Sequence, residues 1–267
     1  MERNGFDSLW LSEVLTTGVL DPLSGLAYAA GVTSKLKLGT TLTVTGRNPV
    51  RLAKELATLD RLSGGRLLLV FVPGLNDPVE NAALGVPLEE RGRWIDEALP
   101  LVRRLWSEDQ VSHTGPRFCF DAVSIHVRPL QDPLEVWLGG TAPSALKRAG
   151  RLSDGWLPSL CTPDEAVAGR RAIEAIAAEA GRRIDPEHFG ISLVYAQSGQ
   201  IPSSQVARIA RRRPGLDPST LVPVGLDALR DMLQRYIAVG FSKFVVRAAE
   251  PPTDLDRLAE AVLSLQT

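Results

Sequence analysis

The sequence predicts an α/β protein whose parallel sheet closes into a (β/α)₈ barrel. Short apolar runs, typical of buried strands, alternate along the chain with segments of helical periodicity. Repeated strand–helix units form parallel sheets, and 267 residues suit one barrel better than an open, doubly wound sheet. No linker rich in Gly, Ser or Pro divides the chain. We therefore expect a single domain over residues 1–267.

The first half of the chain contains three expected strands and three expected helices. Asn48 and Pro49 suit the cap and the first residue of a helix, leucines at i, i+4 and i+7 give it one apolar stripe, and Gly64 ends it. The run after Arg66 is apolar throughout, as a strand covered on both faces should be. The expected strands are residues 7–12, 36–44 and 67–72, and the expected helices are residues 22–33, 49–63 and 88–106.

An irregular segment follows, at about residues 107–133. It contains Gly115 and Pro116 together with several residues that favour strands. We interpret it as an inserted hairpin or loop.

The second half returns to alternating strands and helices. Thr162 and Glu165 have the spacing of a capping box, with Pro163 at the first helical position. Residues 201–222 are polar and rich in arginine, which favours a helix and a mobile loop. The expected strands are residues 134–138, a run that ends at 159, then 189–196 and 243–247; the expected helices begin near 143, 162, 229 and 255.

Residues 134–159 are the most informative segment for function. Gly139 and Gly140 let the backbone turn sharply and let a ligand come close. Thr141 and Pro143 suit the start of a helix, with a hydroxyl near the cap and a proline in the first turn. A glycine-rich turn that opens a helix favours a phosphate, because it presents free N–H groups at the positive end of the helix dipole. An ordinary strand-to-helix turn is the alternative.

Composition and charge exclude several classes of function. A chain with 44% hydrophobic and 23% charged residues belongs with soluble globular proteins, and its net charge of -1 gives no electrostatic reason to expect nucleic acid or an anionic membrane. No apolar stretch approaches the ~20 residues of a membrane span, and no signal peptide is visible. Cys119 and Cys161 are the only cysteines and make no disulfide framework. We expect a cytoplasmic protein.

The common catalytic and nucleotide-binding motifs are missing. The chain has no G-x-G-x-x-G, Walker P-loop, G-x-S-x-G or H-E-x-x-H motif. Its histidines show no metal-ligand spacing, so no metal site is expected. A cofactor would therefore have to bring the chemistry. Structural or surface roles are expected for His113, His126, His188, the arginines 211–213 and Trp137, while Trp156 either packs in the core or lines a pocket.

Five segments together resemble a known family. Their order and spacing are similar to the luciferase-like monooxygenase superfamily, especially its actinobacterial branch of deazaflavin (coenzyme F420) oxidoreductases. The segments are residues 5–13 (GFDSLWLSE), 36–44 (LKLGTTLTV), 48–68, 134–158 and 229–246.

The resemblance implies a barrel that binds a flavin or deazaflavin at the C-terminal ends of its strands. Thr40, Thr41 and Leu42 match the family's bulge beneath the cofactor ring, where a non-proline cis peptide is common; by position it would be Thr41–Leu42. A plain β-strand is the alternative, which the threonines themselves favour.

Three further positions match the family's cofactor site. The phosphate-binding turn corresponds to Gly139, Gly140, Thr141 and Ala142, in agreement with the turn read from the residues alone. Gly74 is what remains of a Gly-x-Gly near the ring, since proline stands at position 73. Glu13 matches an acidic position that faces the cofactor and is the predicted catalytic residue; a surface carboxylate is the alternative.

The chain also departs from the family. Residues 1–4 leave room only for the end of the first helix, so we expect a barrel that lacks the first strand and most of the first helix. Either the true start lies upstream, or the barrel is open, or a partner covers the gap. Val14 stands where some deazaflavin dehydrogenases have a catalytic histidine, so sugar-phosphate dehydrogenase chemistry of that kind is not expected.

These observations predict an oxidoreductase that transfers a hydride between F420 and a small organic substrate. The alternatives are an FMN-dependent luciferase-like monooxygenase, a cofactor-binding paralogue without catalysis, and an unrelated barrel enzyme that binds a sugar phosphate. We expect a homodimer that binds neither nucleic acid nor membrane. The sequence identifies neither the substrate nor the direction of the reaction.

Overall fold

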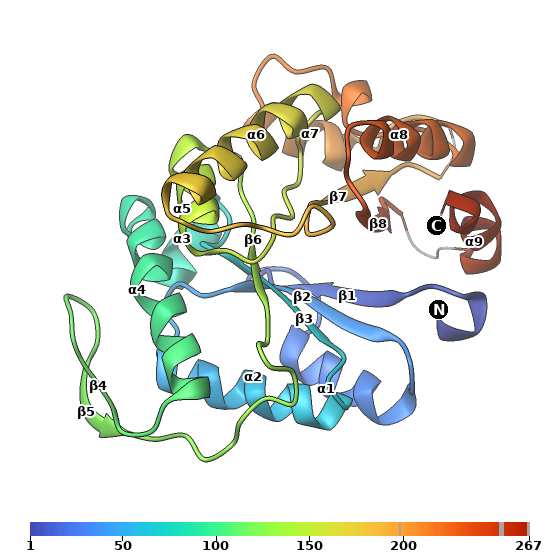
Figure 1. Ribbon diagram of the computed structural model, residues 1–267. Coiled ribbons are helices and arrows are strands. Elements are labelled where there is room, and N and C mark those ends of the chain that lie inside the picture. Colours follow the sequence, from blue (N-terminus) through green and yellow to red (C-terminus); the bar gives the residue numbers. More distant parts are fainter. Residues whose placement is uncertain (198, 251–253, 266–267) are drawn as a thin grey trace. The chain divides into compact units, whose positions relative to one another are not determined.

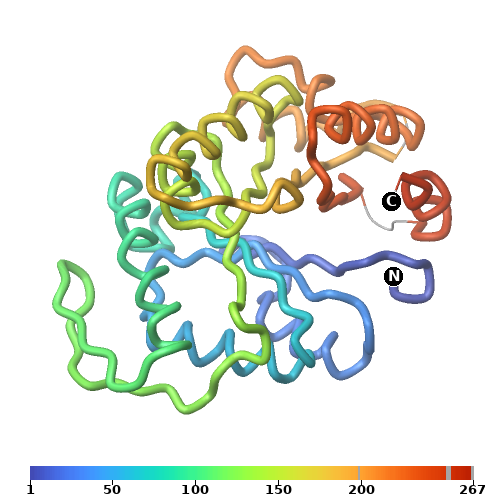
Figure 2. The backbone as a smooth tube through the Cα atoms, viewed as in Figure 1, coloured from blue at the N-terminus to red at the C-terminus, as the bar shows by residue number. Residues whose placement is uncertain are grey.

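The computed structural model of the chain describes residues 1–197, 199–250 and 254–265, whose course is traced in Figures 1 and 2. The chain forms two compact units, and each is described by itself. The first unit comprises Glu2 and residues 7–137; the second comprises Met1, residues 3–6 and the chain from Leu138 onward. The single domain expected over residues 1–267 stays a prediction.

The first unit is built on a parallel sheet with the strand order β1-β2-β3-β6. In register, Leu11 lies opposite Thr40, which lies opposite Leu69. This pairing confirms the expected parallel sheet of strand–helix units. The strands are β1 (Ser8–Ser12), β2 (Lys37–Thr43), β3 (Leu67–Val72) and β6 (Val136–Leu138), and the division between the two units falls within β6.

The helices α1 (Pro22–Val32) and α2 (Pro49–Ser63) cover one face of this sheet, and α4 (Leu88–Ser107) packs on α2 (Figure 1). The Asn48 side chain caps α2 by accepting from the N–H groups of Val50 and Arg51, and Gly64 ends the helix in the left-handed region at φ 71°. The cap, the proline and the glycine therefore act as the sequence predicted. The helices are α1 (Pro22–Val32), α2 (Pro49–Ser63), α3 (Pro78–Leu84) and α4 (Leu88–Ser107).

Helix α3 was not predicted. Its signals are ordinary ones: Asp77 accepts from the N–H groups of Val79 and Glu80, Pro78 is the first helical residue, and Gly85 ends the helix at φ 63°. Because α3 has only seven residues, it has no room for an apolar stripe that would mark it in the sequence.

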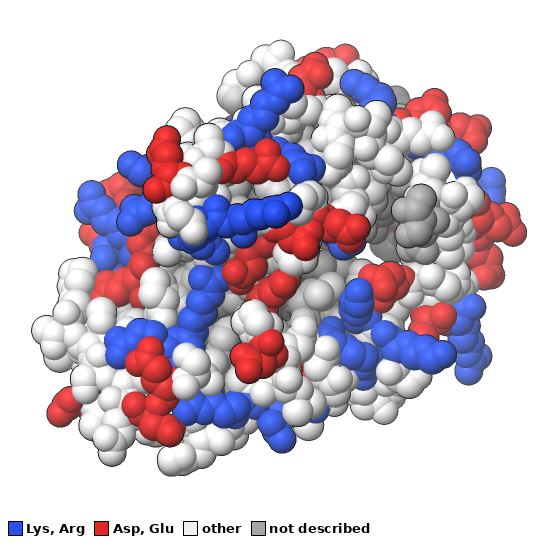
Figure 3. Space-filling view, viewed as in Figure 1, with Lys and Arg blue, Asp and Glu red and all other residues white. Residues whose placement is uncertain are grey.

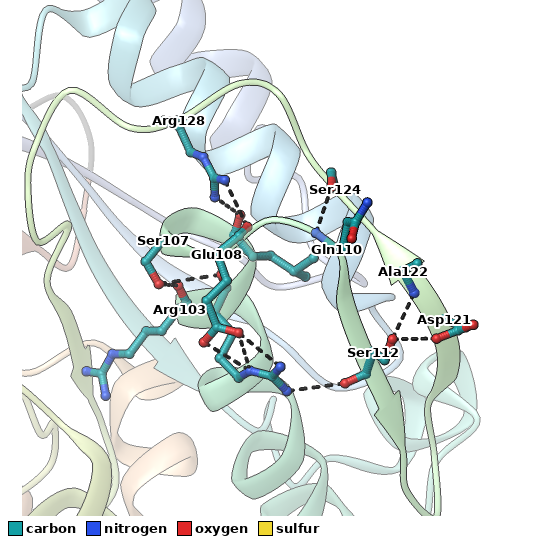
Figure 4. A network of polar contacts seen from close by, with 11 residues as sticks. Arg103, Ser107, Glu108, Gln110, Ser112, Asp121, Ala122, Ser124 and Arg128 are labelled. Carbon is teal, nitrogen blue, oxygen red and sulfur yellow. Dashed lines mark hydrogen bonds and ion pairs between the residues drawn. The ribbon is translucent and has the colours of Figure 1, made fainter.

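The predicted insert contains an antiparallel hairpin of β4 (Val111–Thr114) and β5 (Cys119–Val123). Figure 4 shows the polar contacts at its base. Ser112 Oγ donates to Asp121 Oδ1 at 2.5 Å, and Arg128 donates to two backbone carbonyls at the end of α4, at 2.6 and 2.8 Å. The hairpin is thus held to the end of α4 by Arg128 and also by apolar packing, since the ring of the buried Phe118 lies 5.4 Å from that of Trp94 in α4.

The second unit has a parallel pair of strands, in which Val194 of β7 (Gly190–Tyr195) lies opposite Arg247 of β8 (Lys243–Ala248). The run expected as a strand ending at residue 159 makes only isolated parallel bridges, from Leu138 to Trp156 and from Trp156 to Phe189. The helices are α5 (Pro143–Leu152), α6 (Pro163–Glu179), α7 (Ser203–Arg212), α8 (Leu226–Ala238) and α9 (Leu255–Val262), with 3₁₀ turns at Pro218–Thr220 and Leu263–Leu265.

Trp156 lies at the centre of this unit's core. It is 1% exposed, and its ring lies 6.1 Å from that of Phe241, which in turn contacts Phe189. The backbone of Gly169 in α6 approaches the indole so closely that a Cβ there would stand 2.5 Å from it. Trp156 therefore packs in the core, the first of the two roles expected for it.

The charged side chains of one face are mixed in sign. Acidic and basic side chains are interspersed on the face that Figure 3 shows. Within the described ranges, no helix is long and apolar enough to cross a membrane.

Gly169→Ala should destabilise the protein, because its methyl group would displace the buried Trp156 ring. Overpacking of this kind costs about 1–3 kcal/mol. Chemical denaturation would measure it. Gly31→Ala is the matched control: this glycine is also helical, an added Cβ would meet nothing within 4 Å, and the change should stabilise by about 0.5–1 kcal/mol. Equal effects of both variants would contradict the packing argument.

Candidate functional site

Glu13 is held at the end of β1 by two polar contacts. Its Oε2 accepts from the N–H of Thr43 at 2.8 Å, and its Oε1 accepts from the guanidinium of Arg47 at 2.5 Å. The Glu13 side chain is 7% exposed and that of Arg47 is 25% exposed. The carboxylate is therefore a nearly buried charge with a fixed orientation, and the alternative of a surface carboxylate is wrong.

The side chains of residues 40–43 alternate between the two faces of β2. Leu11 of β1 lies against α1, and it pairs with Thr40, so the Thr40 side chain points to the helix-covered face. Leu42 shares that face and is 0% exposed. Thr41 and Thr43 therefore point to the opposite face of the sheet.

The Thr41–Leu42 peptide is not cis. Within the described ranges, the cis peptide that the structure contains is Asp132–Pro133. Residues 40–43 pair in unbroken parallel register with β3, and the Glu13 N–H donates to the Thr41 carbonyl at 2.9 Å. Regular pairing keeps the peptide extended and trans, so the plain β-strand alternative is the correct one.

Gly74 lies next to Thr43. Its φ is +88°, and an added Cβ would stand 2.7 Å from Leu84 and 3.2 Å from the Thr43 methyl group. Only glycine fits both the backbone angle and the space. The structure thus brings Glu13, Thr43 and Gly74 together at the C-terminal ends of the first three strands.

Two residues near this cluster were not predicted. The hydroxyl of Thr43 is buried and has no hydrogen-bond partner among the described residues, as is also true of Thr40 on the other face. Trp10 is half-buried, and a Cβ on Gly39 would stand 2.3 Å from its ring. What marks Trp10 is that it lies opposite a glycine in the neighbouring strand. That pairing is known only once the strand register is known.

The predicted phosphate turn, residues 139–142, lies in the second unit. Gly140 has φ +96°, and an added Cβ would stand 3.0 Å from that of Ala145. Ala142, not Thr141, is the cap of α5, and it makes no side-chain capping bond; Pro143 is the first helical residue, as expected. In the part of the chain that the structure describes, no hydrogen bond engages the N–H groups of Gly140, Thr141 or Ala142. The turn therefore presents free donors at the start of a helix.

A hydrogen bond from the core of the second unit holds the carbonyl of Gly140. Trp156 Nε1 donates to it at 2.9 Å. Because the C=O and N–H of one trans peptide point in opposite directions, this bond turns the Thr141 N–H away from the indole. The predicted cofactor residues thus form two groups, Glu13, Thr40–Leu42 and Gly74 in one unit and Gly139–Ala142 in the other.

Other reactive side chains have structural roles. His113 Nε2 lies 3.0 Å from Glu97 Oε1, and His188 Nδ1 lies 3.0 Å from the Asp154 carbonyl. Burial raises the pKa of the Cys161 thiol to about 12, so it is no nucleophile. Among the described residues, no group of His, Cys, Asp and Glu is arranged to hold a metal ion.

The expectation of a solvated face for arginines 211–213 is wrong for Arg213. Its guanidinium donates to the Leu160 carbonyl and pairs with Glu165. The bond from Arg213 lowers the pKa of the Glu165 carboxyl, which also completes the predicted capping box at the start of α6.

Comparison with known proteins establishes the family. The family model described as luciferase-like monooxygenase matches residues 1–207, so the chain belongs to the luciferase-like monooxygenase family.

Its curated relatives include two F420-dependent glucose-6-phosphate dehydrogenases. The one from Kineococcus radiotolerans is 32% identical over 58% of this chain and 49% of its own length, and the one from Nakamurella multipartita is 31% identical over 69% and 57%. A 5,10-methylenetetrahydromethanopterin reductase from Methanolobus tindarius is 27% identical over 84% of this chain and 71% of its own. The chain spans about half the length of the first of these relatives.

Solved structures establish the fold. An F420-dependent secondary alcohol dehydrogenase matches 100% of this chain and 92% of its own at a TM-score of 0.82 and 19% identity. A monooxygenase from Streptomyces bottropensis matches 98% and 89% at a TM-score of 0.79 and 24% identity. The chain therefore has the predicted luciferase-like barrel fold, although neither unit by itself shows a closed sheet.

Arg47→Met should destabilise the protein by about 1–3 kcal/mol, because it leaves the charge of Glu13 nearly buried without its partner. Urea denaturation would measure the loss. Lys37→Met is the control within the same unit, since its pair with Asp7 is 3.7 Å long and exposed on both sides; it should change stability by less than about 0.5 kcal/mol. A neutral Arg47→Met would mean that Glu13 does not depend on this pair.

Proposed function

We propose that this protein is an F420-dependent oxidoreductase that transfers a hydride between the deazaflavin and a small organic substrate. The choice of F420 is supported by its relatives, since two are named as F420-dependent dehydrogenases. A structural neighbour named as an F420-dependent secondary alcohol dehydrogenase adds support.

The turn at residues 139–142 carries the proposal. It has the three features that a phosphate site needs: a glycine with positive φ, free N–H groups and the start of a helix directly behind them. The residues present therefore fit the phosphate of a flavin-type coenzyme. Trp156 maintains the turn by holding the Gly140 carbonyl.

By resemblance to the family, the ring end of the coenzyme is assigned to the residues of β2 and Gly74. Bound there, the deazaflavin would supply the carbon that gives or takes the hydride. Thr41 and Thr43 lie on the face of β2 away from the helices, and the buried Thr43 hydroxyl has no hydrogen-bond partner among the described residues. Gly74 keeps the neighbouring backbone free of side chain. The side chains of Thr40 and Leu42 lie on the helix-covered face, so these residues would contact the coenzyme through their backbone groups.

Glu13 is the proposed catalytic residue. Each of its two carboxylate oxygens already accepts one hydrogen bond, from the Thr43 N–H and from Arg47, which fixes the orientation of the group. What Glu13 offers a ligand is a fixed negative charge and its remaining lone pairs. We therefore assign it to the orientation of a donor group on the coenzyme or the substrate.

The other expectations are proposed on the same basis. The protein would work as a homodimer in the cytoplasm, where its substrate is a small molecule. Light scattering of the purified protein tests the dimer, since a monomer at working concentration would contradict it.

F420 should bind more tightly than FMN. Titration of the purified protein with each coenzyme, followed by fluorescence quenching, gives the two dissociation constants. Micromolar binding of FMN without detectable binding of F420 would replace the proposal with an FMN-dependent monooxygenase. Binding of either coenzyme without turnover of alcohols, aldehydes or enoyl compounds would favour the paralogue without catalysis.

Gly140→Val should weaken coenzyme binding by about 2 kcal/mol or more, roughly thirtyfold, because a β-branched side chain blocks the close approach of a phosphate. Gly215→Val is the matched control, since Gly215 has φ +83° but an added Cβ would meet nothing within 4 Å. Both variants carry the strain of positive φ, and Gly140→Val adds a close contact with Ala145, so both should melt lower, Gly140→Val somewhat more, while only Gly140→Val should lose affinity. Wild-type affinity in Gly140→Val would remove the phosphate from this turn.

A further inference from the structure

The second unit contains a recess that the proposed coenzyme site does not use. Its lining includes Ser159, Ser192, Gln205, Arg208 and Arg247. These residues come from the segment after Trp156, from β7, from α7 and from β8. All of the named side chains can donate a hydrogen bond, and no carboxylate lines the recess.

Strand register brings three of these donors to one face. Ser159 bridges to Ser192, and Val194, two residues further along β7, pairs with Arg247. Side chains two residues apart share a face of a strand. Ser159, Ser192 and Arg247 are therefore on the same side, opposite to Phe189, over which the α6 residue Arg170 lies.

Helix α7 adds the second guanidinium. Arg208 lies one turn after Gln205, and its Nη1 is 3.5 Å from Gln205 Oε1. In the described ranges, neither Arg208 nor Arg247 forms an ion pair with a carboxylate. Burial, with Arg247, Arg212 and Arg211 close by, lowers the pKa of Arg208 to about 10.

Two unpaired guanidinium groups in one recess are unfavourable unless an anion joins them. Like charges repel, and Arg208 is partly buried, which removes part of the water that would screen its charge; Arg247 is exposed. Arginine forks and hydroxyl groups match the oxygens of a phosphate or a carboxylate. The recess therefore has hydrogen-bond donors and positive charge that suit an oxyanion. No carboxylate among the described residues lines it to accept those hydrogen bonds.

The recess lies at the end of the strands where a barrel carries its chemistry. Val194 and Arg247 are each the fifth of six residues in their parallel strands, and Gly139 directly follows the end of β6. Active sites of such barrels form at the C-terminal ends of the strands. The phosphate turn and the recess therefore both follow the C-terminal ends of parallel strands, and Trp156 bridges to Leu138 on one side and to Phe189 on the other.

We infer that Arg208 and Arg247, with Ser159 and Ser192, bind an oxyanion on the substrate, either a phosphate or a carboxylate. This inference rests on the proposed function, because that function assigns the turn at 139–142 to the coenzyme. It narrows the substrate to an anionic organic molecule.

Binding of inorganic phosphate to the coenzyme-free protein tests the site directly. Calorimetric titration at constant ionic strength should give saturable binding, and a parallel titration with acetate distinguishes a phosphate site from a carboxylate site. Arg208→Met and Arg247→Met should each weaken binding of the preferred ion by about tenfold or more. Arg183→Met, which removes one exposed charge from the same unit, should leave binding unchanged.

Folding and coenzyme binding are measured on the same variants. Because the two arginines repel each other, neither variant should melt below the wild-type protein in chloride. Titration with F420 should give the wild-type constant in both. An absence of phosphate and acetate binding in the wild-type protein would overturn the inference, as would a loss of F420 affinity in the variants, which would assign the recess to the coenzyme. Since the ion titrations contain no coenzyme, they succeed or fail independently of the proposed oxidoreductase activity.

Discussion

The hydrogen bond from Trp156 to the Gly140 carbonyl links the core of the second unit to its candidate site. The indole is buried against Phe241 and the backbone of Gly169, so its N–H has one direction in which to donate. That direction fixes the carbonyl of a glycine whose φ of +96° most other residues would avoid. Packing of the indole therefore positions the peptide between Gly140 and Thr141, and no polar side chain takes part.

The charged side chains of the two candidate ligand sites differ in whether they are paired. The Glu13 carboxylate is nearly buried, and Arg47 and a backbone N–H neutralise and orient it before any ligand arrives. Arg208 and Arg247 have no such partner among the described residues. A paired charge can be buried at little net cost in free energy. An unpaired charge indicates a site where a bound ligand supplies the opposite charge. This contrast distinguishes a residue that gives shape to a site from residues that await a charged ligand.

Much of the fold was predictable, because its signals are local. The Asn48–Pro49 start and Gly64 end of α2, the capping box at Thr162 and the parallel alternation of strands and helices all follow from neighbouring residues. The glycines of the phosphate turn were predictable for the same reason. The cis bond expected at Thr41–Leu42 came instead from resemblance, and regular pairing of β2 with β3 overrode it.

The remaining site residues depend on contacts between distant segments. Nothing in the sequence around Arg208 distinguishes it from the exposed arginines that follow it. Arg208 lines the recess only because α7 packs beside β7 and β8. Trp10 gains its place only from a register that sets it opposite Gly39. Such residues share no local motif, since their function is a product of register and packing. Strand register therefore determines which face of each strand a ligand meets, and with it which of the chain's arginines, threonines and aromatic residues are available for chemistry.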